Sequence, residues 1–298
     1  MIGGIVDRHN QEGGREQCSL IPCVAGVSRF FMRSVNIASV DMSNSQDPPI
    51  QVLWEDPYVI AVLKPPGILT TRTGNHPSLE QRLLDSLPTC RDSSGPTSNN
   101  VVPLRNSKPF LRMPHRLDRC VSGVVLVAKS ATSSRLLSQQ FAAGNVRKTY
   151  LALVAGRVRG DAATWTDYLA KVPDQPRGIV VDSGHLGAKR ASLACQVLQR
   201  WGNQTLVRLE LQTGRMHQIR IQAAHRGHPI HGDQQYGSTT RWPLTDGTDP
   251  NDAIALHANE ITFRHPKTAV AITVSAAWPE CPVEAMRLNG GLRNNESR

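Results

Sequence analysis

The chain has 298 residues, of which 39% are hydrophobic, and its 34 Lys and Arg against 24 Asp and Glu give a net charge of +10. This length allows one large catalytic domain with an extension, or two modest domains. The positive charge favours a polyanionic partner, most often nucleic acid, and no apolar run is long enough to cross a bilayer, which argues against a membrane protein.

The six cysteines form no C-x-x-C pair and no spacing typical of a metal site. This pattern indicates a reduced intracellular compartment. Arginines among the first 33 residues would suit an organelle transit peptide, but acidic residues in the same segment argue against one. We therefore expect a soluble, cytoplasmic and monomeric protein that uses no cofactor and no metal.

Three parts of the chain differ in pattern. Residues 1–48 lack sustained periodicity and end in a turn-rich stretch, which predicts a poorly ordered N-terminal extension. Residues 49–285 carry the regular elements of the expected catalytic domain, and 286–298 are expected to form a disordered tail. Within the domain, the Ser, Asn, Pro and Gly residues of 90–106 predict a surface insertion.

Residues 49–285 contain more predicted strands than helices. Helical spacing of apolar residues predicts helices at 79–87, after a capping box of Ser78 and Gln81, and at 131–143, before Gly144. Apolar runs predict strands at 51–54, 58–63, 124–129, 148–154, 191–198, 205–211, 254–263 and 270–275. Because these strands do not alternate regularly with helices, we expect an α+β fold on a large mixed sheet.

The most informative stretch is PHRLDRCVSG at 114–123. It sets Asp118 among basic residues and turn formers directly before an apolar strand, which is how a fold presents a reactive carboxylate at a strand edge. Three other segments can share a site with it. They are 147–152, where Tyr150 follows two cations, 213–220, where a strand is expected to turn through Gly214 into a helix carrying Arg215, His217 and Arg220, and 256–258.

Together these segments resemble the RluA-type family of RNA pseudouridine synthases, whose defining stretch reads H-R-L-D-x-x-T-S-G. Here that stretch runs from His115 to Gly123, with Val121 in place of threonine. The resemblance extends over about 51–282, in the family's order, with further matching blocks at 64–67, 148–152, 213–220, 227–237 and 256–258. It implies a mainly antiparallel sheet flanked by helices and loops around a central cleft.

The resemblance also implies an activity, the isomerisation of specific uridines to pseudouridine in structured RNA, either ribosomal or transfer RNA. By the family's motifs, Asp118 is the essential aspartate, Tyr150 the active-site tyrosine, Arg220 the arginine paired with that aspartate, and Leu256 a residue lining the uracil pocket. We expect six further residues to bind the RNA substrate: His115, Arg116, Arg119, Arg147, Lys148 and Arg215.

Each residue type suits this chemistry. A carboxylate is a nucleophile only when ionised, and Arg220 offsets the rise in pKa that burial of Asp118 would cause. Tyr150 offers a flat face for an extracted uracil. The sequence does not show whether Asp118 attacks ribose carbon 1 or uracil carbon 6, or whether Tyr150 helps remove the carbon 5 proton.

Other interpretations remain open at this stage. A catalytically inactive RNA-binding protein would keep the pocket as a surface, although it would have no need of a nucleophile with its counter-ion. The histidines at 217, 225, 228 and 231 lack a compact zinc spacing, and no G-x-S-x-G elbow supports a serine hydrolase. Val121 lacks the hydroxyl that the family's threonine places beside the catalytic turn, and Gln222 stands where the family usually has histidine. We expect these departures to alter the hydrogen bonding around the site and to tune the activity without abolishing it.

Overall fold

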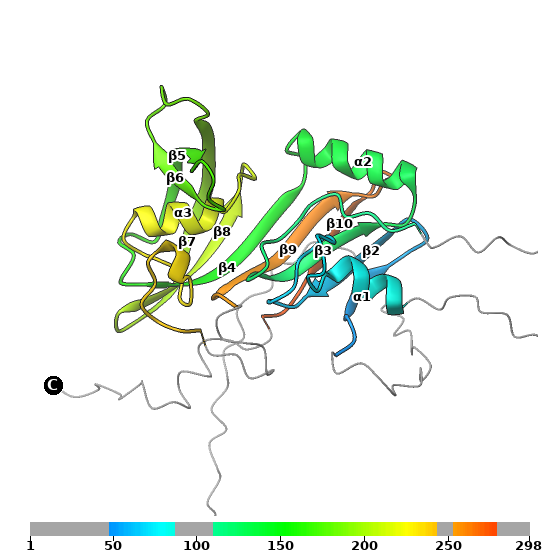
Figure 1. Ribbon diagram of the computed structural model, residues 1–298, viewed down its shortest axis with the longest axis horizontal. Helices are drawn as coiled ribbons and strands as arrows, with labels where there is room; N and C mark the ends of the chain where they lie inside the picture. The colour runs from blue at the N-terminus through cyan, green and yellow to red at the C-terminus, as the bar shows by residue number, and fades with distance from the viewer. Residues whose placement is uncertain (1–47, 87–109, 243–252, 279–298) are drawn as a thin grey trace, which may run out of the picture. The chain divides into compact units, whose positions relative to one another are not determined.

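The computed structural model describes residues 48–86, 110–242 and 253–278, and ten strands within them form one sheet (Figure 1). The expected extension, insertion and C-terminal tail lie outside the described residues. Nine strands follow one another in the order β1 (Val52–Glu55), β2 (Val59–Lys64), β3 (Ser122–Ala128), β9 (Leu256–Arg264), β4 (Arg147–Ala155), β8 (Gln204–Leu211), β7 (Lys189–Trp201), β5 (Ala162–Lys171) and β6 (Gly178–Val181). The tenth, β10 (Ala271–Ser275), pairs with β9.

All strand pairs are antiparallel except β3 with β9. This parallel pair is short, joining Ser122 to His257 and Gly123 to Ala258. The sheet is therefore mixed and mainly antiparallel, as expected, with its one parallel contact at the end of the PHRLDRCVSG stretch. Every residue of β3 is buried, which explains its uninterrupted apolar sequence.

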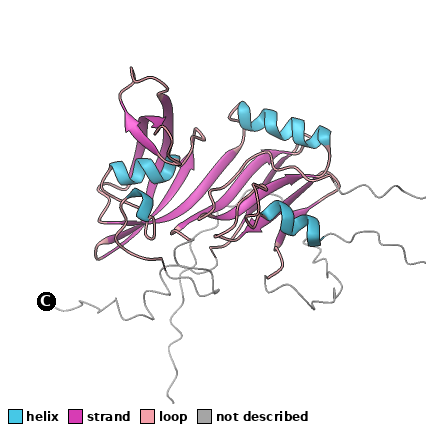
Figure 2. Ribbon diagram, viewed as in Figure 1, coloured by secondary structure: helices cyan, strands magenta, loops and turns pink. Residues whose placement is uncertain are grey.

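Helices are few and short in the described part of the chain. They are α1 (Leu79–Ser86), α2 (Ala131–Ala142), α3 (Gln218–His225) and the 3-10 turn η1 (Gln234–Tyr236). Ser130 caps α2 by accepting a hydrogen bond from the Ser133 amide. Figure 2 shows α2 against the β3 and β9 part of the sheet and α3 beside β5 and β6, an arrangement in which α2 contacts β3 and β9 while α3 contacts β5 and β6. No described helix is long and apolar enough to span a membrane.

Two strands were not predicted from the sequence. The first half of β5 is Ala-Ala-Thr-Trp-Thr, exposed except for the tryptophan, and β6 has only four residues, so neither shows a clear apolar alternation. The predicted helix at 213–220 starts later than expected, at Gln218, because His217 adopts a left-handed conformation with φ of 50°. Arg215 and His217 therefore lie in the turn before α3 and not on the helix.

The junction of β3 and β9 depends on two residues of the motif. Gly123 has φ of 126°, and a Cβ atom built on it would lie 2.4 Å from the carbonyl oxygen of Ala258. Only glycine allows the two backbones to approach this closely. Next to it, the Ser122 hydroxyl lies 2.8 Å from Nδ1 of the fully buried His257, whose Nε2 lies 3.2 Å from the Ala276 carbonyl. Burial lowers the pKa of His257 to about 4, so the ring is neutral and links the two strands.

Candidate active site

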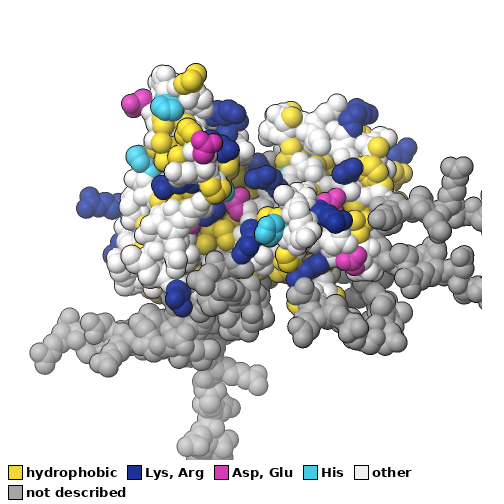
Figure 3. Space-filling model, in the orientation of Figure 1, with side chains coloured by type: hydrophobic (Ala, Val, Ile, Leu, Met, Phe, Trp, Pro, Cys, Tyr) yellow, Lys and Arg dark blue, Asp and Glu magenta, His cyan; other side chains and the backbone are white. Residues whose placement is uncertain are grey.

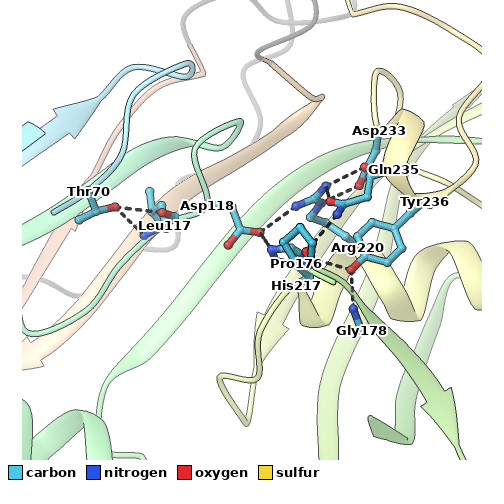
Figure 4. Close-up of polar contacts among 10 residues, drawn as sticks. All are labelled: Thr70, Leu117, Asp118, Pro176, Gly178, His217, Arg220, Asp233, Gln235 and Tyr236. Carbon is cyan, nitrogen blue, oxygen red and sulfur yellow. Dashed lines mark hydrogen bonds and ion pairs between the residues drawn. The ribbon is translucent and has the colours of Figure 1, made fainter. Parts of the chain in front are cut away.

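Hydrogen bonds from the end of β2 and the segment that follows it fix the loop that carries Asp118. The Thr70 hydroxyl donates to the Leu117 carbonyl at 2.9 Å and accepts from the Leu117 amide at 3.0 Å (Figure 4). On the other side of Asp118, the carbonyl of Arg119 accepts hydrogen bonds from the Gly67 amide and from Nζ of Lys64. Both neighbours of Asp118 are thus fixed through their backbone, which restricts where its carboxylate can point.

Lys64 has no exposed surface. Its Nζ donates to three carbonyl oxygens, those of Pro65 at 2.8 Å, Ile68 at 2.9 Å and Arg119 at 3.1 Å. Burial lowers the pKa of this lysine to about 7, against the opposing effect of negative charges that include Asp118. Lys64, the first residue of the matching block at 64–67, therefore links the end of β2 to the Asp118 loop.

Arg220 connects Asp118 to a second carboxylate, Asp233. Its Nη1 lies 3.2 Å from Oδ2 of Asp118, while Nε and Nη2 lie 2.7 and 2.9 Å from the two oxygens of Asp233 (Figure 4). The pairing of Arg220 with Asp118 was expected, but the bidentate partner is Asp233, which was assigned no role from the sequence. Burial acts to lower the pKa of Arg220, yet the Asp233 hydrogen bonds and nearby negative charges raise it above its usual range, so the guanidinium stays charged.

Tyr150 and Leu256 come from neighbouring strands, β4 and β9, and both side chains are buried. Burial, together with the charge of Asp118, raises the pKa of the Tyr150 hydroxyl above its usual range. Tyr150 is therefore a neutral phenol with its ring against the apolar core. Leu256 adds apolar surface on the adjacent strand, so the two side chains can form the wall of a pocket for a flat, uncharged ring.

Two clefts meet at Asp118, one with a volume of about 640 Å³ and the other of about 510 Å³. Arg116 and Arg220 also line both. The larger cleft brings together eight of the ten residues predicted for the site, namely Asp118, Tyr150, Arg220, Leu256, His115, Arg116, Lys148 and Arg215. Asp118 remains partly exposed, with 21% of its side-chain surface accessible, so a ligand in either cleft can reach it.

The two remaining predicted residues lie elsewhere. Arg119 lines only the smaller cleft. Arg147 is outside both, and its guanidinium lies between Glu210 and Glu260 at 3.7 Å from each. In the space-filling view, Lys and Arg side chains (dark blue) lie on both sides of the hollow between the α2 side and the β5 and β6 side (Figure 3). A polyanion entering the larger cleft would therefore meet positive charge on both walls.

His115 lines the larger cleft but also has a structural contact. Its Nε2 accepts a hydrogen bond from the Leu126 amide at 2.9 Å, and its ring stacks on Phe141 with centroids 4.6 Å apart. Burial and the charge of Lys148 lower the pKa of His115 to about 3. It is a neutral acceptor that joins the motif to β3 and α2, a role that the motif match alone did not indicate.

The two departures from the family pattern are both buried. Val121 packs in the main apolar core, and its amide donates to the Asp118 carbonyl in the turn at 3.1 Å. Gln222 donates to Asp167 at 2.6 Å and to the Trp165 carbonyl at 3.3 Å, which anchors α3 to β5. The hydrogen bonds of Gln222 are therefore made away from the Asp118 carboxylate.

Tyr236 was also missed from the sequence, and so was any role for His217. Tyr236 and Asp233 both lie in the matching block at 227–237, so their membership of this block was the signal in the sequence that could have identified them. Their contacts with Arg220 are visible only in the folded structure. Among the described residues, no group of three or more His, Cys, Asp or Glu side chains is arranged to hold a metal ion.

The sequence matches a family model described as RNA pseudouridylate synthase over residues 58–225. It is 34% identical over 240 residues to tRNA pseudouridine synthase C of Pasteurella multocida (strain Pm70), covering 76% of this chain and 90% of that protein. It is 31% identical over 244 residues to ribosomal large subunit pseudouridine synthase D of Xylella fastidiosa (strain Temecula1), covering 79% of this chain and 68% of that protein.

A solved structure shares the fold. The human RNA pseudouridylate synthase domain containing 1 superposes with a TM-score of 0.60 at 21% identity, covering 81% of this chain and 89% of that one. At this identity the likeness concerns the arrangement of the sheet and helices. It agrees with the α+β architecture built around the two clefts.

Proposed function

The chain belongs to the RluA-type group of the RNA pseudouridylate synthase family, and we propose that Asp118 is the nucleophile with which it isomerises uridine in RNA. Isomerisation breaks the bond between uracil nitrogen 1 and ribose carbon 1, turns the base and joins carbon 5 to the same ribose carbon. The proton leaves carbon 5 and nitrogen 1 gains one, so neither an oxidant nor an external group is needed.

The observation that carries this assignment is the position of Asp118 where the two clefts meet, in contact with a charged Arg220. A carboxylate must be ionised to form a transient covalent bond to the nucleotide, and the Arg220 guanidinium at 3.2 Å places a positive charge beside Asp118. Asp233 accepts from Nε and Nη2 of the same guanidinium and Gln235 accepts from Nη2, so Asp118 is contacted by Nη1 alone and not by a bidentate pair.

Tyr150 and Leu256 are proposed to hold the uracil ring. A neutral phenol has a hydrogen-bond donor and a flat face, and because the pKa of Tyr150 is raised the group stays protonated and offers no phenolate to act as a base. We therefore assign Tyr150 to stacking and donation to the base edge. Leu256 is buried on the strand next to Tyr150. Its apolar side chain would replace part of the contact that the uracil ring loses when it leaves a base stack.

A uridine in structured RNA must be flipped out of its stack to reach Asp118, at a cost of a few kcal/mol. Contacts to phosphates by basic residues offset this cost. Arg116, Lys148 and Arg215 line the larger cleft and are proposed for these contacts, with Arg119 in the smaller cleft. Arg147 is bridged by two acids, so we expect it to contribute least.

Tritium release from carbon 5 tests the nucleophile. Transcripts of ribosomal and transfer RNA carrying tritium at carbon 5 of uridine are incubated with the protein and with Asp118→Asn. We expect release by the unchanged protein and none by the variant. Release that persists in Asp118→Asn would remove the nucleophile assignment, while no release from any cellular RNA would favour an RNA-binding protein without catalysis.

The two named bacterial relatives act on different RNA classes by their descriptions, transfer RNA and large-subunit ribosomal RNA. The substrate of this chain is proposed to be a uridine in one of these two classes. Mapping pseudouridines in total RNA from cells with and without the protein identifies it. A missing pseudouridine restored by the unchanged protein, but not by Asp118→Asn, is the expected result.

A further inference from the structure

His217 lies beside Asp118 and has no part in the proposal above. Its Nε2 is 3.7 Å from Oδ2 of Asp118, and its Nδ1 is 2.8 Å from the hydroxyl of Tyr236 (Figure 4). The imidazole therefore bridges the proposed nucleophile and a buried tyrosine. Only 13% of its side-chain surface is exposed, so these contacts dominate its surroundings.

The hydroxyl of Tyr236 fixes which ring nitrogen of His217 carries the proton. The amide of Gly178 donates to this hydroxyl at 3.0 Å, so the hydroxyl must send its own proton elsewhere. Within the described part of the chain, the acceptor in reach is Nδ1 of His217. With Nδ1 accepting, a neutral imidazole carries its proton on Nε2, the atom that faces Asp118.

The opposite tautomer would be unfavourable on both sides of the ring. A proton on Nδ1 would leave the Tyr236 proton without its acceptor, and it would turn the Nε2 lone pair toward a carboxylate oxygen. Burial also lowers the pKa of His217, in spite of the Asp118 charge, while burial raises that of Tyr236. Both groups are therefore neutral at physiological pH.

Tyr236 also supports the other donor to Asp118. The Arg220 guanidinium lies over the Tyr236 ring, 4.9 Å from its centroid, while His217 meets the same ring edge-on at 5.8 Å. Arg220 and His217 approach the same oxygen, Oδ2. Among the described residues, no side-chain hydrogen bond reaches Oδ1, which Figure 4 shows turned away from both donors.

We propose that His217 is a positioning residue that, as a neutral imidazole, directs its Nε2–H at Oδ2 of Asp118 and, with Arg220, leaves Oδ1 as the attacking oxygen. The inference rests on the proposed role of Asp118 as nucleophile. At 3.7 Å the contact is too long for a hydrogen bond, and the proposal requires it to shorten to one when substrate is bound, as catalytic hydrogen bonds commonly do.

Two substitutions of His217 distinguish the effect of a side chain too short to contact Asp118 from an effect on the backbone conformation. His217 has φ of 50°, a conformation that asparagine tolerates well, but the asparagine amide is too short to reach Asp118. Glutamine places its amide nitrogen near the position of Nε2 and keeps the donor. We expect His217→Asn to lower kcat for tritium release about 100-fold with KM changed less than about 3-fold, and His217→Gln to stay within about 10-fold of the unchanged protein.

His185→Asn is the matched control, because His185 is exposed in the turn between β6 and β7. We expect it to retain full activity. A loss in His217→Gln as large as that in His217→Asn would overturn the positioning role, because the longer amide would then fail to restore the donor; a larger loss in His217→Gln would point to the backbone instead and would overturn it too, since asparagine suits the left-handed conformation better. Full activity of His217→Asn beside an inactive Asp118→Asn would overturn this inference alone, whereas full activity of Asp118→Asn would overturn the nucleophile as well.

A spectroscopic measurement tests the tautomer without activity. In protein labelled with nitrogen-15 in histidine side chains, the signals missing from His217→Gln belong to His217. At pH 7 we expect one pyrrole-type nitrogen at Nε2 and one pyridine-type nitrogen at Nδ1, and a shift toward mixed tautomers in Tyr236→Phe. A charged ring or a proton fixed on Nδ1 in the unchanged protein would contradict the proposal.

Discussion

The buried Lys64 makes the stability of the protein depend on pH in a way that can be calculated. Its pKa falls from the ordinary 10.5 to about 7 because the side chain is removed from water. Each pKa unit corresponds to about 1.4 kcal/mol, so keeping Lys64 charged in the folded state costs about 5 kcal/mol. This cost is present in full below pH 7, where both states bind the proton, and it is relieved as pH rises toward 10.5.

The variant Lys64→Met removes the titrating group and keeps most of its volume. Between pH 7 and pH 9 the unfolded chain binds more protons at Lys64 than the folded one, so stability rises with pH. We expect the free energy of unfolding of the unchanged protein, relative to Lys64→Met, to increase by about 2 kcal/mol over this range. The loss of three hydrogen bonds in the variant adds a constant offset that does not change the slope.

Urea unfolding followed by circular dichroism at pH 6, 7, 8 and 9 measures the difference. Lys267→Met serves as the control, because the Lys267 side chain is exposed and makes no hydrogen bond or ion pair with the other described residues. Its curve is expected to run parallel to that of the unchanged protein. A difference between the unchanged protein and Lys64→Met that stays flat or falls from pH 7 to pH 9 would show that Lys64 remains charged in the folded state.

Three further substitutions test the geometry around the site. Gly123→Ala places a Cβ atom 2.4 Å from the Ala258 carbonyl oxygen and is expected to prevent folding, whereas Gly144→Ala, with φ of 73° but no atom within 4 Å, should cost only about 1–2 kcal/mol in thermal unfolding. Asp233→Asn leaves the buried Arg220 without its bidentate partner and should lower the free energy of unfolding in urea by about 3–5 kcal/mol. The control Asp161→Asn, in the exposed pair with Arg200, should lower it by about 0–1 kcal/mol. Equal losses would show that Asp233 does not stabilise the buried Arg220. The pKa of His115 is lowered to about 3, so the stability that its neutral form contributes is complete above pH 6.5 and is lost as pH falls. Between pH 6.5 and 4.5 the free energy of unfolding of the unchanged protein should fall by about 2 kcal/mol relative to His115→Gln. Parallel stability curves for the two proteins would refute this.

The sequence predicted most of the sheet because apolar strands leave a local pattern. Strand β3, buried along its whole length, and helix α2, with its serine cap, were both predicted close to their observed bounds. Strand β5 was missed, because its exposed first half carries no alternation, and the four-residue β6 is too short to give a signal. The order of strands was not predictable either, since β9 is placed by contacts with residues more than a hundred positions away.

The site was predicted as far as motifs extend. Asp118, Tyr150, Arg220 and Leu256 come together in one cleft, as the resemblance implied. Asp233 escaped assignment because an aspartate after a glycine is an ordinary turn residue until Arg220 is seen against it. The part played by Tyr236 depends on Gly178, a residue 58 positions earlier in a strand that was itself not predicted. Long-range polar contacts of this kind leave no periodicity in a sequence.

The place of β9 in the sheet has a consequence for synthesis of the chain. It lies between β3 and β4, yet it follows the end of β4 by about 100 residues. At the usual translation rates, the ribosome needs about 5–20 s to add those residues, and during this time β3 and β4 each wait with an unpaired edge. The growing chain lacks Leu256, and with it one part of the pocket wall, until that late strand emerges, so a chaperone that shields the two edges would protect the chain during this interval.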